Sequence, residues 1–252
     1  MEWKIIHIDE TDSTNRWLRD DSASDKYGLT RTENGEVSNS SCQSAGKVVV
    51  ADYQTAGRGC GTNRWEAERG KNLLFSMLIH PKDVPASRQF RLSMAVSLAI
   101  CEALEELIGD VSIKWPNDIY WRDGKICGIL IENTLTGAVI KDCIIGVGLN
   151  VNQRVFHSDA PNPVSLLQIS GQDTDRDALL HHILERFGQL LTQDVRQRYL
   201  SKLYRRKGFY PYADEKGAFM AEFVDVKDDG HLVLRDDGGT WRTYAFKEVR
   251  FI

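Results

Sequence analysis

The sequence has few of the residues that mark disulfide-rich or zinc-binding proteins. Its 252 residues include only five cysteines, an odd number, and these are widely spaced with no CxxC pair. Such a set indicates neither a disulfide framework nor a zinc site. We therefore expect reduced thiols and a cytoplasmic protein.

Long apolar runs and a strong excess of positive charge are also missing. No uninterrupted apolar stretch is long enough to span a bilayer, and charges occur throughout the first ten residues. The net charge is −4, whereas a nucleic-acid-binding domain usually presents a strongly basic face. We therefore expect neither a membrane nor DNA among the partners.

Apolar residues make up 42% of the chain, which is enough for the core of one large domain and a small one. Residues 22–46 contain almost no apolar side chains and indicate a long exposed loop. The spacing of apolar residues elsewhere predicts strands at 3–8, 48–53 and 72–79, and helices at 87–108 and 174–207, the second helix ending at Gly208.

The middle and the end of the chain are rich in strand and turn signals. Asp123–Gly124 is a strong hairpin signal and Thr136–Gly137 a weaker one, so three successive antiparallel strands are expected here. After Gly208, short strands alternate with tight turns over roughly forty residues, which is typical of a small barrel. A sheet therefore dominates the middle region, and a separate β module follows it.

A glycine-rich segment, GRGCGTNRW at Gly57–Trp65, comes directly after the apolar run KVVVADYQ. Glycine lets a ligand approach the main chain closely, and arginine offers forked donors for carboxylate or phosphate. A polar surface turn would explain the segment about as well. We do not expect Cys60 to be a catalytic nucleophile, because no histidine lies close in sequence to act as its base.

Lys114, in the motif KWPND, stands at the end of an apolar strand that Pro116 must interrupt. A lysine aimed inward is costly unless it meets an anion, so the expected partner is a ligand carboxylate or phosphate. The alternative is a lysine whose ammonium group reaches solvent.

Together, Arg58, Arg64 and Lys114 would place positive charge around glycine main chain beside apolar strands. Such a site suits a ligand with an apolar body and an anionic end. Gly146 and Gly148 leave volume on a strand where a planar or ring-shaped group could lie against the backbone, although a strand bulge is an equally good explanation.

Three motifs follow one another along the chain: DSTN at Asp12–Asn15, ADYQTAGRG at Ala51–Gly59, and KWPND at Lys114–Asp118. The segments KICGILIE and GVGLN come after them. Taken alone, Ser13 and Thr14 could simply cap a short helix at 16–19. In this order and spacing, however, the set resembles the biotin protein ligases, also called biotin–[acetyl-CoA-carboxylase] ligases, over about residues 5–153.

The resemblance implies an α+β fold. A class II synthetase-like catalytic domain, with a mixed, largely antiparallel sheet and helices, would occupy residues 1–208. A small SH3-like β-barrel would follow at 209–252. It also implies two half-reactions, in which biotin and MgATP give biotinyl-5′-AMP and pyrophosphate, and a lysine of the biotin carboxyl carrier protein then takes the biotinyl group and releases AMP.

The resemblance also assigns roles to residues. Ser13, Thr14 and Asn15, with Gln54 beside them, would hold the biotin head group, and Arg58 and Lys114 would be the catalytic residues. No ligands for Mg²⁺ can be named from it. The glycine loop could close over the water-labile anhydride. The full expected substrate-binding set is Ser13, Thr14, Asn15, Gln54, Gly57, Arg58, Gly59, Cys60, Lys114, Gly128, Gly148 and Asn150.

Two features depart from the family pattern. Cys60, Gly61 and Thr62 follow GRG in place of further basic residues, which predicts a looser grip on the adenylate. Ser13 also comes too early for an N-terminal DNA-binding domain, so we expect a monofunctional ligase without operator binding, and a homodimer is compatible with the resemblance. Two alternatives stay open: a lipoate or octanoate ligase or transferase of related fold, and a non-enzymatic biotin sensor.

Overall fold

The computed structural model describes residues 1–25, 46–157 and 161–252. The loop predicted at 22–46 therefore lies almost entirely outside the described residues. The chain divides into two compact units. The first unit comprises residues 1–83, 127–160 and 165–180, and the second comprises residues 84–126, 161–164 and 181–252.

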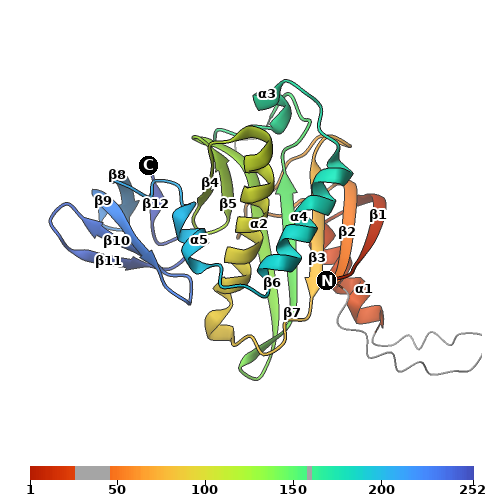
Figure 1. Cartoon of the computed structure of the whole chain (residues 1–252), viewed down its shortest axis with the longest axis horizontal. Coiled ribbons are helices and arrows are strands. Elements are labelled where there is room, and N and C mark those ends of the chain that lie inside the picture. Colours follow the sequence, from red (N-terminus) through yellow and green to blue (C-terminus); the bar gives the residue numbers. More distant parts are fainter. Residues whose placement is uncertain (26–45, 158–160) are drawn as a thin grey trace, which may run out of the picture. The chain divides into compact units, whose positions relative to one another are not determined.

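A seven-stranded sheet dominates the structure, with the order β1-β2-β3-β7-β6-β5-β4 (Figure 1). Strand β1 pairs with β2 in parallel, whereas the pairs β2–β3, β3–β7, β7–β6 and β4–β5 are antiparallel. This confirms the prediction of a mixed, largely antiparallel sheet. The strands are β1 (Trp3–Thr11), β2 (Gly46–Gln54), β3 (Leu73–Ile79), β4 (Val111–Lys114), β5 (Asp118–Trp121), β6 (Gly124–Thr136) and β7 (Val139–Leu149).

The centre of the first unit is β3, whose seven residues are all buried. A strand with both faces covered has to be apolar throughout, which explains the run LLFSMLI. Helix α1 (Thr14–Asp25) packs on this sheet through Leu18, which is fully buried among Val49, Leu78 and Ile144. This contact fixes the start of α1 over strands β2, β3 and β7.

The KWPND region turns as predicted. The apolar pattern suggests a single strand here, but the structure has two, β4 and β5, joined by a turn at Trp115–Asn117. The two hairpin signals also mark real connections. However, β6 already begins at Gly124, so the first turn consists of Arg122 and Asp123, one residue earlier than expected.

The long helix predicted at 174–207 is wrong, because two shorter helices replace it. Helix α4 spans Arg176–Leu190 and α5 spans Arg196–Ser201. Between them, the Asp194 carboxylate accepts a hydrogen bond from the Arg196 backbone N–H at 3.1 Å, so a new helix start competes with continuation of the old one. Helix α5 also ends well before Gly208.

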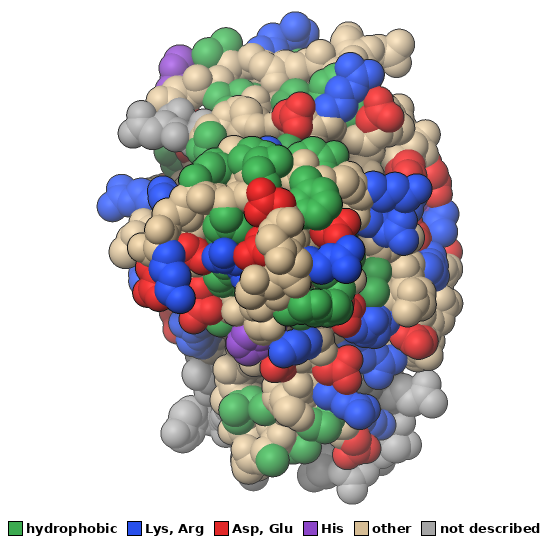
Figure 2. All heavy atoms as spheres, turned by 90° about the vertical axis from the view of Figure 1, so that its left-hand side faces the viewer, with side chains coloured by type: hydrophobic (Ala, Val, Ile, Leu, Met, Phe, Trp, Pro, Cys, Tyr) green, Lys and Arg blue, Asp and Glu red, His purple; other side chains and the backbone are tan. Residues whose placement is uncertain are grey.

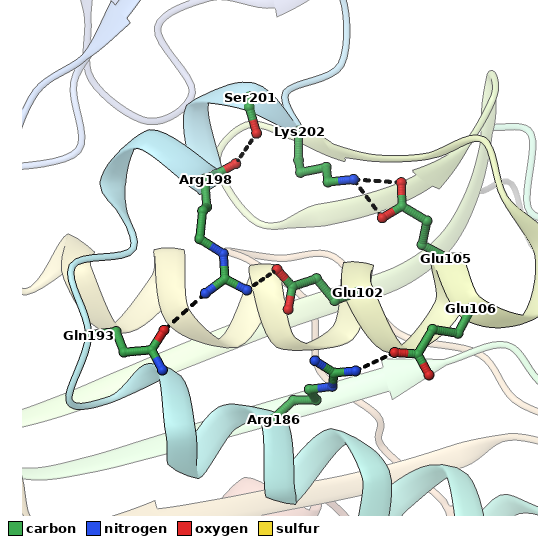
Figure 3. A network of polar contacts seen from close by, with 8 residues as sticks. All are labelled: Glu102, Glu105, Glu106, Arg186, Gln193, Arg198, Ser201 and Lys202. Atoms are coloured by element: carbon green, nitrogen blue, oxygen red, sulfur yellow. Dashed lines mark hydrogen bonds and ion pairs between the residues drawn. The ribbon is translucent and has the colours of Figure 1, made fainter.

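Helix α2 (Phe90–Ile108), preceded by the short 3₁₀ helix η1 (Ala86–Arg88), forms the core of the second unit. Ion pairs join its polar face to α4 and α5 (Figure 3). Arg198 contacts Glu102 at 2.6 Å, and Lys202 contacts Glu105 at 2.5 Å. Because these side chains are partly exposed, each pair contributes only about 0–1 kcal/mol.

The C-terminal part of the second unit is a five-stranded antiparallel sheet with the order β11-β10-β9-β8-β12 (Figure 1). This confirms the small β module, whose first strand begins at Phe209; the domain boundary at 208 itself stays a prediction. The strands are β8 (Phe209–Asp214), β9 (Gly217–Val226), β10 (Leu232–Asp236), β11 (Trp241–Tyr244) and β12 (Arg250–Phe251).

Charges of both signs are interspersed with hydrophobic side chains over the face drawn in Figure 2. This mixture agrees with the small net charge of −4. Within the described ranges, none of the helices combines the length and apolar character that crossing a membrane requires.

Candidate active site

The DSTN segment lies where β1 ends and α1 begins. Ser13, Thr14 and Asn15 are only 3%, 4% and 2% exposed. The helix starts at Thr14, so Thr14 and Asn15 belong to its first turn and do not precede it as caps. The Oε1 atom of Gln54 lies 2.8 Å from the Thr14 backbone nitrogen and 3.1 Å from its hydroxyl. The structure thus brings the four residues predicted for the biotin head group into one region.

Ser76 belongs to the same cluster, although sequence reasoning missed it. It is fully buried in β3, and its Oγ lies 2.7 Å from the Thr14 hydroxyl and 2.6 Å from Asn15 Oδ1. A serine has a single hydroxyl hydrogen, so both contacts are hydrogen bonds only if the Thr14 hydroxyl donates one of them. The available signal was one polar residue inside an otherwise apolar run.

Gly146 explains how Asn15 fits on the sheet. It pairs with Ser76 across β3 and β7, and a Cβ atom at this position would lie 2.2 Å from Asn15 Oδ1. The pairing of these two strands, as described, continues through Gly146 without a register shift. The missing side chain therefore makes room for a planar group, which in this structure is the chain's own Asn15 amide.

Gly148 is covered in the same way. A Cβ atom there would lie 2.4 Å from the indole ring of Trp65. Gly148 pairs with Gly128 on β6, so the two predicted site glycines face each other across neighbouring strands. Asn150 follows directly after β7, is 3% exposed, and accepts a hydrogen bond through its carbonyl from the Leu166 N–H at 3.1 Å.

The glycine loop Gly57–Trp65 folds back on itself as a small hairpin. The Trp65 N–H donates to the Gly57 carbonyl at 3.0 Å, and the Gly59 N–H donates to the Asn63 carbonyl at 2.8 Å. A Cβ atom at Gly57 would lie 2.4 Å from the Trp65 carbonyl oxygen, so only glycine fits this close approach. Cys60, partly exposed, begins the turn of the hairpin.

Glu132, near the middle of β6, is the second member of the site that sequence reasoning missed. Its carboxylate meets Asn15 and Arg19 of α1 and Arg58 of the glycine loop. Burial acts to raise its pKa, but the hydrogen bonds from Asn15 and Arg19 and the charges of Arg19 and Arg58 outweigh burial, so its pKa lies below the ordinary value. A charged residue at the end of the apolar run KICGILIE was the available signal.

Lys114, the other predicted catalytic residue, belongs to the second unit. It ends β4, and its ammonium group donates a hydrogen bond to the Tyr120 hydroxyl at 2.9 Å. The ring centroid of Phe251, on β12, lies 5.3 Å from the same nitrogen. Burial lowers the pKa of Lys114, against the opposing influence of Asp118. The ammonium group is therefore partly desolvated, and its role in binding an anion stays a prediction.

Metal ligands do not gather among the described residues. No group of three or more histidine, cysteine, aspartate or glutamate side chains in this part of the chain could hold a metal ion. The four described cysteines likewise form no disulfide bond with one another.

The chain is similar to proteins of one family in sequence. Residues 27–150 match the family described as the biotin/lipoate A/B protein ligase family. The bifunctional ligase/repressor BirA of Bacillus subtilis is 31% identical over 223 residues, a match that covers 79% of this chain and 65% of BirA. The biotin–[acetyl-CoA-carboxylase] ligase of Mycobacterium tuberculosis is 34% identical over 208 residues, covering 77% and 74%.

The fold is similar as well. The biotin protein ligase from Aquifex aeolicus, solved in complex with biotin and ATP, superimposes with a TM-score of 0.74 at 26% identity, and the match covers 99% of each chain. The motifs, the sheet order and the relatives agree, and the chain belongs to the biotin protein ligase family.

Proposed function

We propose that this protein is an ATP-dependent biotin protein ligase that attaches biotin to a lysine of the biotin carboxyl carrier protein. The observation that carries the proposal is a polar cluster on the apolar sheet, formed by the buried residues Thr14, Asn15 and Ser76 together with the partly buried Gln54. Similarity to the Aquifex ligase, whose structure contains biotin and ATP, supports the same assignment.

The cluster suits the head group of biotin, a cyclic urea with one carbonyl acceptor and two N–H donors. Hydroxyl and amide side chains at Ser13, Thr14 and Asn15 offer both donors and acceptors in a buried setting. A site built from buried polar groups rejects a ligand that leaves them unpaired. The apolar strands nearby would take the thiophane ring and the aliphatic tail.

We assign to Arg58 and Lys114 the stabilisation of the negative charge that develops in the first half-reaction. A carboxylate oxygen of biotin forms a bond to the α-phosphorus of MgATP, and the bond from that phosphorus to the β-phosphate oxygen breaks. Pyrophosphate leaves with the electron pair. Cationic side chains and backbone N–H groups of the glycine loop stabilise the negative charge that develops at the phosphoryl group.

In the second half-reaction, the neutral amine of the carrier lysine attacks the carbonyl carbon of the mixed anhydride. An amide bond forms, the bond between that carbon and the phosphate oxygen breaks, AMP departs with the electron pair, and the attacking nitrogen releases one proton to solvent. The proposed role of the hairpin Gly57–Trp65 is to keep water from the anhydride until the amine arrives.

Biotin-dependent exchange of pyrophosphate into ATP tests the proposal. We expect exchange with biotin and none with lipoate. Exchange with lipoate alone would instead favour the second candidate, a lipoate or octanoate ligase, which the breadth of the matched family supports. Biotin binding without any exchange would favour a sensor.

We further propose a cytoplasmic setting without DNA or a membrane as partner, and homodimer formation remains a prediction.

A further inference from the structure

We propose that Glu132 is a positioning residue of this site, which orients the Asn15 amide and anchors the Arg58 guanidinium group of the glycine loop. The inference rests on the proposed ligase function. It assigns a role to a side chain that is expected to act through its neighbours without touching the substrate.

The carboxylate of Glu132 joins three segments of the first unit. Its Oε2 atom accepts a hydrogen bond from Asn15 Nδ2 at 2.8 Å. Its Oε1 atom lies 2.8 Å from the Arg19 guanidinium and 3.1 Å from that of Arg58. Strand β6, helix α1 and the glycine loop therefore meet at one side chain, of which only 22% is exposed.

The first consequence concerns the orientation of the Asn15 amide. Its nitrogen faces the Glu132 carboxylate and the Leu130 carbonyl, the latter at 3.4 Å, while its oxygen faces the Ser76 hydroxyl at 2.6 Å. An ionised carboxylate and a carbonyl only accept hydrogen bonds, so they select the orientation that turns the NH₂ group toward β6. Glu132 thus decides which atom of Asn15 is presented on the opposite side, where biotin is proposed to bind.

The second consequence concerns charge. Arg58 is 40% exposed, so it would have many rotamers available without an anchor. Arg19 and Arg58 share a single carboxylate, which leaves one positive charge uncompensated within this trio. An anionic ligand at the glycine loop can supply the missing charge without displacing Glu132.

Glu132→Gln separates the two roles, whereas Glu132→Ala removes both. The glutamine keeps an oxygen that can accept from Asn15 but loses both ion pairs. We expect the KM for biotin to stay within about threefold of wild type in Glu132→Gln while kcat falls about tenfold. In Glu132→Ala we expect kcat to fall similarly and the KM for biotin to rise about tenfold as well.

The experiment measures biotin-dependent ATP–pyrophosphate exchange over a range of biotin concentrations for the wild type and both variants. The matched control is Glu10→Gln, which removes a partly exposed carboxylate on β1 that pairs with Arg69. We expect wild-type constants from it. Thermal unfolding of each variant identifies losses of activity that come from losses of fold.

The possible outcomes distinguish failure of the positioning role of Glu132 from failure of the proposed function. Glu132 variants that behave like Glu10→Gln in an active wild-type background would overturn the positioning role alone. Equal rises in the KM for biotin in the glutamine and alanine variants would overturn the orientation of Asn15 by Glu132. A wild type without exchange would overturn both the proposed function and this inference.

Discussion

Gly146 and Ser76 show how much of the site depends on small residues. They face each other across β3 and β7, and the Asn15 amide occupies the space above Gly146 while it bonds to Ser76. Gly146 begins the segment GVGLN, whereas Ser76 belongs to none of the motifs that indicated the family. Both act by letting a side chain from α1 sit directly on the sheet.

We expect Gly146→Ala to displace Asn15, because the added carbon would lie 2.2 Å from Asn15 Oδ1. The free energy of unfolding should fall by about 1–3 kcal/mol, and the KM for biotin should rise. Urea unfolding and pyrophosphate exchange measure the two effects. Gly238→Ala is the control, since its carbon would meet only Asp236 at an ordinary 3.4 Å; equal behaviour of the two variants would contradict the packing role of Gly146.

Ser76→Ala removes the hydroxyl that Thr14 and Asn15 share. A buried amide oxygen loses its partner, so we expect a loss of about 1–3 kcal/mol in the free energy of unfolding. Ser97 is the matched comparison, because it is also buried but its hydroxyl has no hydrogen-bond partner among the described residues. Ser97→Ala should cost much less in the same urea titration, and a reversed order would count against the proposed network.

Lys114 should make the exchange activity depend on pH. Burial lowers its pKa below the ordinary 10.5, and only the charged ammonium can stabilise a phosphoryl group. Exchange activity should therefore be present below the lowered pKa and decline as the pH rises through it, so the alkaline limb lies below pH 10.5. A pH profile of kcat/KM checks this, because it reports the pKa values of the free enzyme. Lys114→Ala should show very little exchange, and near-normal exchange would remove Lys114 from the mechanism.

At the scale of single residues, the motifs identified Thr14, Asn15 and Gln54 as neighbours, but they did not identify Ser76 or Glu132. Asn15 and Glu132 are 117 positions apart in the sequence. Their contact exists only because the start of α1 lies over β2, β3 and β7 in one particular register, which brings Asn15 beside the Glu132 side chain of β6. A sequence pattern read locally contains no information about that register.

Strands and turns followed the sequence more closely than helices did. The apolar runs located β2 and β3, and the hairpin signals located the connections around β6. The 174–207 region was harder, because its apolar spacing continues through the break between α4 and α5. In that break, the side chains of Thr192 and Asp194 form hydrogen bonds with nearby backbone groups, and these bonds interrupt the helix. The spacing of apolar residues contains no sign of them.

Helix α3 (Leu166–Ser170) was also missed, although its start carries a recognisable signal. Ser165 and Gln168 form a reciprocal capping box, the S-x-x-Q pattern. We expect Ser165→Ala to lower the free energy of unfolding by about 1–2 kcal/mol, since the hydroxyl is buried and also donates to the Gln153 carbonyl at 2.6 Å. Chemical denaturation measures the change, with the exposed Ser201→Ala as control; equal small losses would contradict the capping role.

For the whole molecule, the order of the motifs identified the family, whereas composition gave only the expectation that neither DNA nor a membrane is a partner. The sheet order and the C-terminal β module agree with what that resemblance implied. The sequence did not show which side chains fill the space over the glycines of β7. The volumes over Gly146 and Gly148, predicted as room for a planar group, are occupied by Asn15 and Trp65 of the same chain.

The central claim concerns the complete reaction, and the mass of a carrier domain tests it most directly. A biotin carboxyl carrier domain is incubated with this protein, biotin and MgATP, and its intact mass is then measured. We expect a gain of one biotinyl group that requires all three components and disappears when the acceptor lysine is replaced. An unchanged mass, or a gain with lipoate in place of biotin, would contradict it.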